Sequence, residues 1–208
     1  MFPTPPIWGE ACYPVPMSRK GKSASMTGLR QLRPISIEEY LEGEQHSDIR
    51  HEYVGGEPYA MVGATETHNL IVGNIFAALH NHLRGTACRV FSATMKLRVG
   101  DDFYYPDVFV SCERVKGEYL FLTRPALIVE VLSPGTELLD TRDKLQAYQR
   151  IEVLREYAIV EQNRPEVRVI SRAGQKWESV TYTGTMSVRL ASVDLALPLG
   201  DIYHDVEA

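Results

Sequence analysis

Long apolar runs are missing from this sequence of 208 residues, and their absence excludes a protein that spans a membrane with helices. The longest runs, such as Ala126–Val129, are far shorter than the roughly 20 residues that a spanning helix needs. Residues 1–16 also lack the basic start and the continuous apolar core of a signal peptide. We therefore expect a cytoplasmic protein with no membrane partner.

Cysteine is scarce. The three cysteines, Cys12, Cys88 and Cys112, are odd in number and widely separated. Their spacing matches neither a disulfide framework nor a zinc site, so we expect reduced thiols.

Basic residues are not in excess either. The chain has 22 Lys and Arg and 27 Asp and Glu, which gives a formal net charge of −5. That balance argues against a protein that simply coats nucleic acid, because such proteins carry a basic stripe. It is compatible with a site that holds cations, which must itself be acidic. With 44% hydrophobic and 24% charged residues, the composition is that of a globular domain.

The order of expected elements predicts an α/β fold with a mixed central sheet flanked by helices. Residues 1–33, rich in proline and small residues, are expected to form a tail without regular structure, and residues 34–208 a single domain. The first expected elements are a helix that opens with the capping box Ser36–Glu39, a hairpin of 52–54 and 58–61 around Gly55-Gly56, and an amphipathic helix with Val72, Phe76, Leu79 and Leu83 on one face. Strands are then expected at 88–99, 105–111 and 126–132, followed by a helix at 140–152 and a strand at 156–160. A closing hairpin is expected at 167–170 and 177–182.

Glu130 is the most informative residue, because it interrupts the apolar segment 126–132 that is expected to be a buried central strand. A buried carboxylate without a partner costs several kcal/mol, and a cation, a metal ion or protonation relieves that cost. One interpretation is a strand-end carboxylate paired with an arginine. The other, which we favour, is a functional site.

Asp107 is the second candidate carboxylate. Pro106 restricts the chain just before a strand and leaves Asp107 at the strand entrance, although Pro-Asp is also common in turns. Two neighbouring strands that each contribute one inward carboxylate can hold Mg²⁺, or Mn²⁺, through oxygen ligands and water. Such an ion could orient an attacking water and neutralise charge on a phosphate.

Lys144 is the third candidate, on the helix expected at 140–152, where Asp140, Lys144 and Tyr148 share one face. A solvated Asp140–Lys144 pair is the simple alternative. If the helix packs beside the strand of Glu130, the Lys144 ammonium can reach a scissile phosphate.

Three weaker candidates complete the predicted site. Glu52 could add a ligand, although an exposed hairpin acid is the simpler interpretation. His68 opens the amphipathic helix, where a histidine is more often a cap or a surface group. Tyr148 follows Lys144 by one helical turn.

These motifs together resemble the Uma2 family, also known as DUF820. The resemblance rests on Tyr105-Pro106-Asp107-Val108, Ile128–Thr136, Asp140, Lys144 and Tyr148, with further likeness at His51-Glu52-Tyr53, Ala60-Met61, His68-Asn69 and Glu156–Val160. It covers about residues 34–206.

The resemblance implies the restriction endonuclease-like fold of the PD-(D/E)xK nucleases, with Asp107 and Glu130 as the two acids. Leu132 stands where that signature has its lysine, and Lys144 from the following helix would replace it. The leading hypothesis is a Mg²⁺-dependent endonuclease that cuts DNA, with a homodimer favoured if both strands are cut. The alternative is a catalytically inactive module of the same fold that binds DNA or a protein partner.

Overall fold

The computed structural model describes residues 34–61, 63–113, 119–132 and 139–206. The predicted tail, residues 1–33, lies outside the described residues, as do the side chains of residues 139–141. The described residues form four α-helices and mixed β-sheets, as expected for an α/β protein. No helix within these ranges has both the length and the apolar character needed to cross a membrane.

The chain divides into two compact units, which are described separately. Unit 1 comprises Met1–Val62 with Asp101–Phe103, and unit 2 comprises Gly63–Gly100 with Tyr104–Ala208.

Unit 1 is built from a helix and a small antiparallel sheet. Its elements are α1 (Ile37–His46), β1 (His51–Val54), β2 (Glu57–Ala60) and the start of β5 (Asp102–Tyr104). The predicted capping box is confirmed, because the Ser36 hydroxyl accepts from the Glu39 amide and the Glu39 carboxylate accepts from the Ser36 amide. The predicted hairpin is confirmed as well. Gly55 and Gly56 both adopt positive φ, 62° and 89°, which a two-residue turn of this kind requires.

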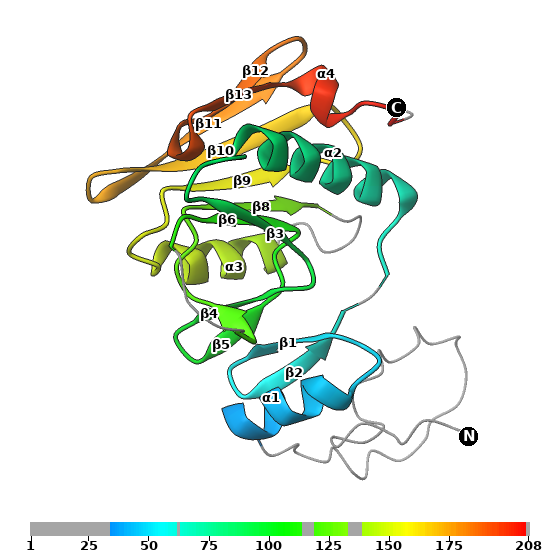
Figure 1. The fold of residues 1–208 in the computed structure, drawn as a ribbon, viewed down its shortest axis with the longest axis vertical. Coiled ribbons are helices and arrows are strands. Elements are labelled where there is room, and N and C mark those ends of the chain that lie inside the picture. The colour runs from blue at the N-terminus through cyan, green and yellow to red at the C-terminus, as the bar shows by residue number, and fades with distance from the viewer. Residues whose placement is uncertain (1–33, 62, 114–118, 133–138, 207–208) are drawn as a thin grey trace, which may run out of the picture. The chain divides into compact units, whose positions relative to one another are not determined.

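Unit 2 is built around a six-stranded sheet with the order β11-β10-β9-β8-β6-β3. Its helices are α2 (Glu66–His82), α3 (Leu139–Gln149) and α4 (Leu199–Ile202), and its strands are β3 (Arg89–Ser92), β4 (Lys96–Val99), β6 (Val108–Ser111), β7 (Phe121–Leu122), β8 (Leu127–Val131), β9 (Glu156–Val160), β10 (Glu166–Ala173), β11 (Lys176–Thr183), β12 (Ser187–Leu190) and β13 (Leu195–Pro198), with a short 3-10 turn at Ala191–Val193. Figure 1 shows β9, β8 and β6 following one another beneath β10.

One pair of neighbours in this sheet, β8 and β9, is parallel, and α3 forms the crossover between them. The other pairs, β11 with β10, β10 with β9, β6 with β8 and β3 with β6, are antiparallel. A parallel connection needs a crossover of a dozen or more residues, and that requirement brings α3 back over the strand that carries Glu130.

The prediction of a buried central strand is confirmed by β8, whose five residues are all buried. Val129 and Val131 pack in one cluster with Ile71 and Ile75 of α2. Because side chains alternate along a strand, Glu130 points to the opposite face, where α3 lies.

Three predicted elements are wrong in detail. The single strand expected at 88–99 is two strands, since a turn closed by the Met95 amide and the Ser92 carbonyl (3.0 Å) separates β3 from β4. The two halves then pair with different partners, β6 and β7.

The buried stripe of α2 runs through Ile71, Ile75 and Leu79, while Val72 and Phe76 are half-buried beside it. The hairpin at 167–182 does not close the fold, because β12, β13 and α4 follow it.

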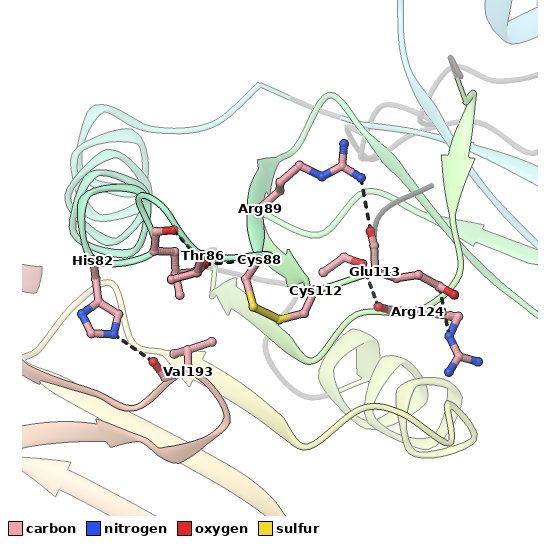
Figure 2. Close-up of a disulfide and its surroundings, with 10 residues drawn as sticks. His82, Thr86, Cys88, Arg89, Cys112, Glu113, Arg124 and Val193 are labelled. Carbon is pink, nitrogen blue, oxygen red and sulfur yellow. Dashed lines mark hydrogen bonds and ion pairs between the residues drawn. A yellow bond between two sulfur atoms is a disulfide. The ribbon is translucent and has the colours of Figure 1, made fainter. Parts of the chain in front are cut away.

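The expectation of reduced thiols is wrong for two of the cysteines, because Cys88 and Cys112 form a disulfide (Figure 2). In the β3–β6 pairing Arg89 lies opposite Ser111, so the next residues outward, Cys88 and Cys112, also face each other. Spacing alone could not predict this bond. The two cysteines are 24 residues apart and meet only because β3 and β6 are neighbours in the sheet.

Candidate active site

Asp107 and Glu130 lie side by side at one end of two neighbouring strands. Val108 of β6 pairs with Val129 of β8, so Asp107 and Glu130 are the next pair in the same register. The Asp107 amide lies 3.4 Å from Glu130 Oε2, and the Val131 amide donates to Asp107 Oδ2 at 2.8 Å. Each carboxylate is thus held by the backbone of the other strand.

The helix α3 brings two further groups to Glu130. Lys144 Nζ lies 3.7 Å from Glu130 Oε1, and the Tyr148 hydroxyl donates to the same oxygen at 2.8 Å. Lys144 and Tyr148 are one helical turn apart, so a single face of α3 supplies both. Tyr148 is fully buried, and its ring contacts Tyr104 and Tyr157 edge-on at 5.4 and 5.3 Å between centroids.

His68, on the first turn of α2, contacts the other carboxylate. Its Nε2 lies 3.1 Å from Asp107 Oδ1, and its Nδ1 is buried with no hydrogen-bond partner among the described residues. The sequence favoured a cap or a surface group here. Thr65 caps the helix instead, and His68 is only 9% exposed. Its spacing of three and seven residues from Ile71 and Ile75 was the available signal, because that spacing puts His68 on the buried stripe.

The remaining weaker candidate, Glu52, lies half-buried in β1 of unit 1, and a role for it as a ligand stays a prediction. The suggested Asp140–Lys144 pair involves a side chain outside the described set. Lys144 is instead seen paired with Glu130.

The four charged or ionisable side chains of the site are largely withdrawn from water. Their exposed fractions lie between 11% and 14% for His68, Asp107, Glu130 and Lys144. Two carboxylates this close repel one another, and their partial burial strengthens that repulsion. Lys144, with Nζ 3.7 Å from Glu130 Oε1, offsets part of that repulsion.

The carboxylate pair has the donor chemistry for one hard divalent cation. Among the residues that the structure describes, no cluster of three or more His, Cys, Asp or Glu is suited to a metal ion. Mg²⁺ commonly binds through one or two carboxylates and keeps several waters. Each carboxylate oxygen has two lone pairs, so the hydrogen bonds described above leave capacity for a cation.

Comparison with known proteins assigns the family. The sequence model of the Uma2 family, described as "Putative restriction endonuclease", matches residues 37–200. The chain belongs to the Uma2 family. The resemblance that the sequence motifs indicated is therefore confirmed.

Two similar Uma2 relatives come from Synechocystis sp., and both are named as uncharacterized. The protein slr1290 is 32% identical over 174 residues, which cover 82% of this chain and 92% of that protein. The protein sll1609 is 29% identical over 133 residues, which cover 62% and 75%. A solved structure from Anabaena variabilis, titled a "putative nuclease belonging to DUF820", matches with a TM-score of 0.68 at 20% identity, over 82% of this chain and 98% of that one. At that identity the likeness shows the fold alone.

Proposed function

We propose that this Uma2 protein is a metal-dependent endonuclease of the restriction endonuclease-like fold that hydrolyses phosphodiester bonds of DNA. One observation carries the proposal: two partly buried carboxylates, Asp107 and Glu130, meet across neighbouring strands with Lys144 3.7 Å from one of them. Two acids at the ends of adjacent strands can hold a hard divalent cation for phosphodiester hydrolysis, and a lysine from the next helix can stabilise the charge that develops on the phosphate. The family description and the fold of the DUF820 relative point in the same direction.

In this proposal Asp107 and Glu130 hold Mg²⁺ or Mn²⁺. The ion would supply a Lewis acid that polarises the phosphate and lowers the pKa of the attacking water. The carboxylates themselves would fix the position of the cation. Hydrolysis adds the water oxygen to phosphorus and breaks one phosphorus–oxygen ester bond, and the departing sugar oxygen takes up a proton. Each strand cut therefore leaves one phosphate end and one hydroxyl end.

The other side chains have separate tasks. Lys144 donates to a non-bridging phosphate oxygen, where negative charge grows in the transition state. Tyr148 orients Glu130 through its hydroxyl, and His68 orients Asp107 through Nε2. Lys144 thus replaces the lysine that the signature sequence has at the position of Leu132.

The test is cleavage of supercoiled and linear DNA by purified protein with Mg²⁺ or Mn²⁺ and with EDTA. Asp107→Asn and Glu130→Gln keep the shape of each side chain and remove its charge. We expect each to lower the cleavage rate by about 10²-fold or more, the scale seen when a preorganised charge contact is lost. Lys144→Met should lower the rate on a similar scale.

Matched controls are available on β11, where Glu178 and Lys176 are exposed. Glu178→Gln and Lys176→Met should leave the rate unchanged. A wild-type protein that binds DNA but cuts no form of it with either metal ion would contradict the nuclease and support the inactive DNA-binding module. Equal rates for wild type and Asp107→Asn would exclude this carboxylate pair as the site.

A further inference from the structure

A pocket of about 510 Å³ opens in unit 2, beyond the C-terminal end of α3. Three segments line it, the end of β4, the residues after β7 and the residues after α3, and each contributes one arginine: Arg98, Arg124 and Arg150. The volume lies within the range of about 300–1,000 Å³ that is usual for small-molecule sites. The pocket is therefore large enough for a phosphate with part of its sugar.

The charge of this lining is opposite in sign to that of the whole chain. The lining contains three arginines and one carboxylate, that of Glu152, whereas the whole chain has a formal net charge of −5. Guanidinium groups bind phosphate oxygens through two parallel hydrogen bonds, which makes arginine the favoured residue for phosphate recognition. The lining therefore favours an anionic ligand with several oxygens.

Two of these arginines are arranged in ways that suit such a ligand. Arg98 is oriented by its own surroundings, because its Nε donates to the Gly100 carbonyl at 2.7 Å and its guanidinium lies 5.6 Å from the centroid of the Phe121 ring. Arg124 pairs with Glu113 at 3.0 Å, with both side chains about half exposed. An ion pair that exposed contributes little free energy, so a phosphate can replace the carboxylate at low cost.

The C-terminal end of a helix normally repels an anion, but at the end of α3 this repulsion is reduced. Its terminal carbonyls carry partial negative charge. Arg172 occupies one of them, since its Nη2 donates to Gln149 O at 3.2 Å. The same side chain also donates to two carbonyls of the turn that follows α3, from Nη2 to Ile151 O at 2.8 Å and from Nε to Leu154 O at 2.9 Å. This positive group compensates the carbonyls next to the pocket.

Two elements, β4 and α3, relate the pocket to the carboxylate site along the chain. Lys96 and Arg98 are two residues apart on β4 and so point to the same face. Lys96 Nζ lies 5.5 Å from the ring centroid of Tyr105, which precedes Asp107 by two residues. Arg150, the residue that follows the end of α3, comes six residues after Lys144, which corresponds to about 9 Å of rise along the helix axis. One DNA strand carries a phosphate for about every 3.4 Å of helix axis, so this spacing corresponds to a few nucleotides.

We propose that this pocket binds a non-scissile phosphate of the DNA strand that is cut, a few nucleotides from the scissile bond, with Lys96 on the path between them. The inference rests on the proposed nuclease function and deepens it. The pocket would fix the strand so that the scissile phosphate lies against Asp107 and Glu130. Arg98, Arg124 and Arg150 act as binding residues and take no part in bond breaking.

The test is oligonucleotide binding under conditions that prevent cutting. Fluorescence anisotropy with a labelled 16-nucleotide strand in Ca²⁺ or EDTA buffer would compare wild type with Arg124→Gln, Arg150→Gln and the double variant. We expect each single variant to weaken binding by about three- to tenfold, and the double variant to reduce the salt slope of log K by about one. In cleavage assays KM should rise while kcat stays close to the wild-type value.

Arg189→Gln, an exposed arginine of β12, is the matched control and should bind like the wild type. Arg150→Lys keeps the positive charge and loses the two-point contact, so it should fall between wild type and Arg150→Gln. Thermal unfolding of each variant checks that the fold is intact. Equal loss in Arg150→Gln and Arg189→Gln, or no loss in either, would overturn the proposal.

Free phosphates are the second possible source of the same chemistry. Inorganic phosphate and pyrophosphate, added as competitors, should displace the oligonucleotide only at high concentration. If pyrophosphate binds the wild type tightly while oligonucleotide affinity does not depend on Arg124 or Arg150, the pocket serves a free phosphate and the strand assignment fails. The nuclease proposal fails separately: an inert wild type whose DNA binding still needs these arginines would keep the pocket and lose the catalytic site.

Discussion

Glu130 receives donors of three chemical kinds, namely the Tyr148 hydroxyl, the Lys144 ammonium and the Asp107 amide. Hydrogen bonds to a partly buried carboxylate are stronger than neutral ones, and removing one partner leaves the charge poorly solvated. Glu130 is therefore fixed in orientation before any ligand arrives. Such fixing is what a site needs if its charge is to act on a bound ion without rearrangement.

Tyr148→Phe tests this fixing while keeping the ring and its contacts with Tyr104 and Tyr157. A hydrogen bond to a charged group contributes about 1.5–3 kcal/mol, and 1.4 kcal/mol corresponds to a factor of ten. We expect kcat for DNA cleavage to fall about tenfold or more, with KM nearly unchanged. Tyr182→Phe on β11 is the matched control, and an equal decrease in both variants would exclude an orienting role for Tyr148.

At the scale of single residues, the sequence predicted part of the site. Asp107 and Glu130 stood out because ionisable residues beside or within apolar segments need a partner, and Lys144 stood out because its helix could pack beside the strand of Glu130. The structure brings these three together, and their catalytic roles stay predictions. The sequence could not predict the contact of His68 with Asp107, because 39 residues separate the two and no local sequence pattern relates them. The backbone amides of Asp107 and Val131 were equally hidden, because their direction depends on the register between β6 and β8.

At the scale of elements, the long and periodic segments were predicted well and the short strands were not. Strand β8 and helix α2 have the length and the apolar pattern that determine their type. By contrast β7 has two residues and β5 has three, so each forms only because a neighbouring strand supplies hydrogen bonds. Tertiary pairing of this kind leaves no periodic pattern to detect.

The disulfide between β3 and β6 gives a prediction for stability. Closing a loop over a sequence separation of 24 stabilises the folded state by about 3 kcal/mol, chiefly by restricting the unfolded chain. The double variant Cys88→Ala/Cys112→Ala should lose about that much unfolding free energy in oxidising buffer, as measured by urea denaturation. A reductant should destabilise the wild type by a similar amount and leave the variant unchanged. A reductant effect that persists in the variant would contradict this account.

Tyr203, which ends α4, connects that helix to the β9–β10 hairpin and gives a prediction for pH. Its hydroxyl donates toward the carbonyls of Glu161 and Glu166 at 2.7 and 2.9 Å, and burial raises the pKa of this phenol from 10.0 to about 12. A raised pKa means that the unfolded state releases the proton first as the pH rises. The contribution of Tyr203 is therefore complete below pH 10 and is lost as the pH rises toward 12.

Tyr203→Phe lacks this titration. We expect it to be less stable than the wild type at pH 8, because it loses the hydrogen bonds, and to lose less stability than the wild type between pH 10 and pH 12. Chemical denaturation at a series of pH values measures both effects. Parallel pH profiles for the two proteins would show that Tyr203 is not the group that titrates.

For the molecule as a whole, a bound cation should appear as added stability. A ligand that binds only the folded state raises the unfolding free energy by RT ln(1 + [L]/Kd), which is about 2.7 kcal/mol at a hundredfold excess over Kd. We expect Mg²⁺ or Mn²⁺ to raise the Tm of the wild type by several degrees, and to leave Asp107→Asn and Glu130→Gln almost unchanged. The same shift in wild type and in both variants would indicate that the cation binds elsewhere.

The side chains that hold Glu130 and Asp107 come from different sequence separations. Glu130 is held by Tyr148, 18 residues later and on the helix that directly follows its strand, whereas Asp107 is held by His68, 39 residues earlier on a separate helix. Local opening that detaches the first turn of α2 would remove the His68 contact of Asp107 while the β8–α3 segment stays closed, and would leave the Val131 amide as the remaining described hydrogen-bond partner of that carboxylate. In amide hydrogen exchange, the Val131 amide, whose acceptor is Asp107 Oδ2, should then exchange sooner than the amides in the middle of β8.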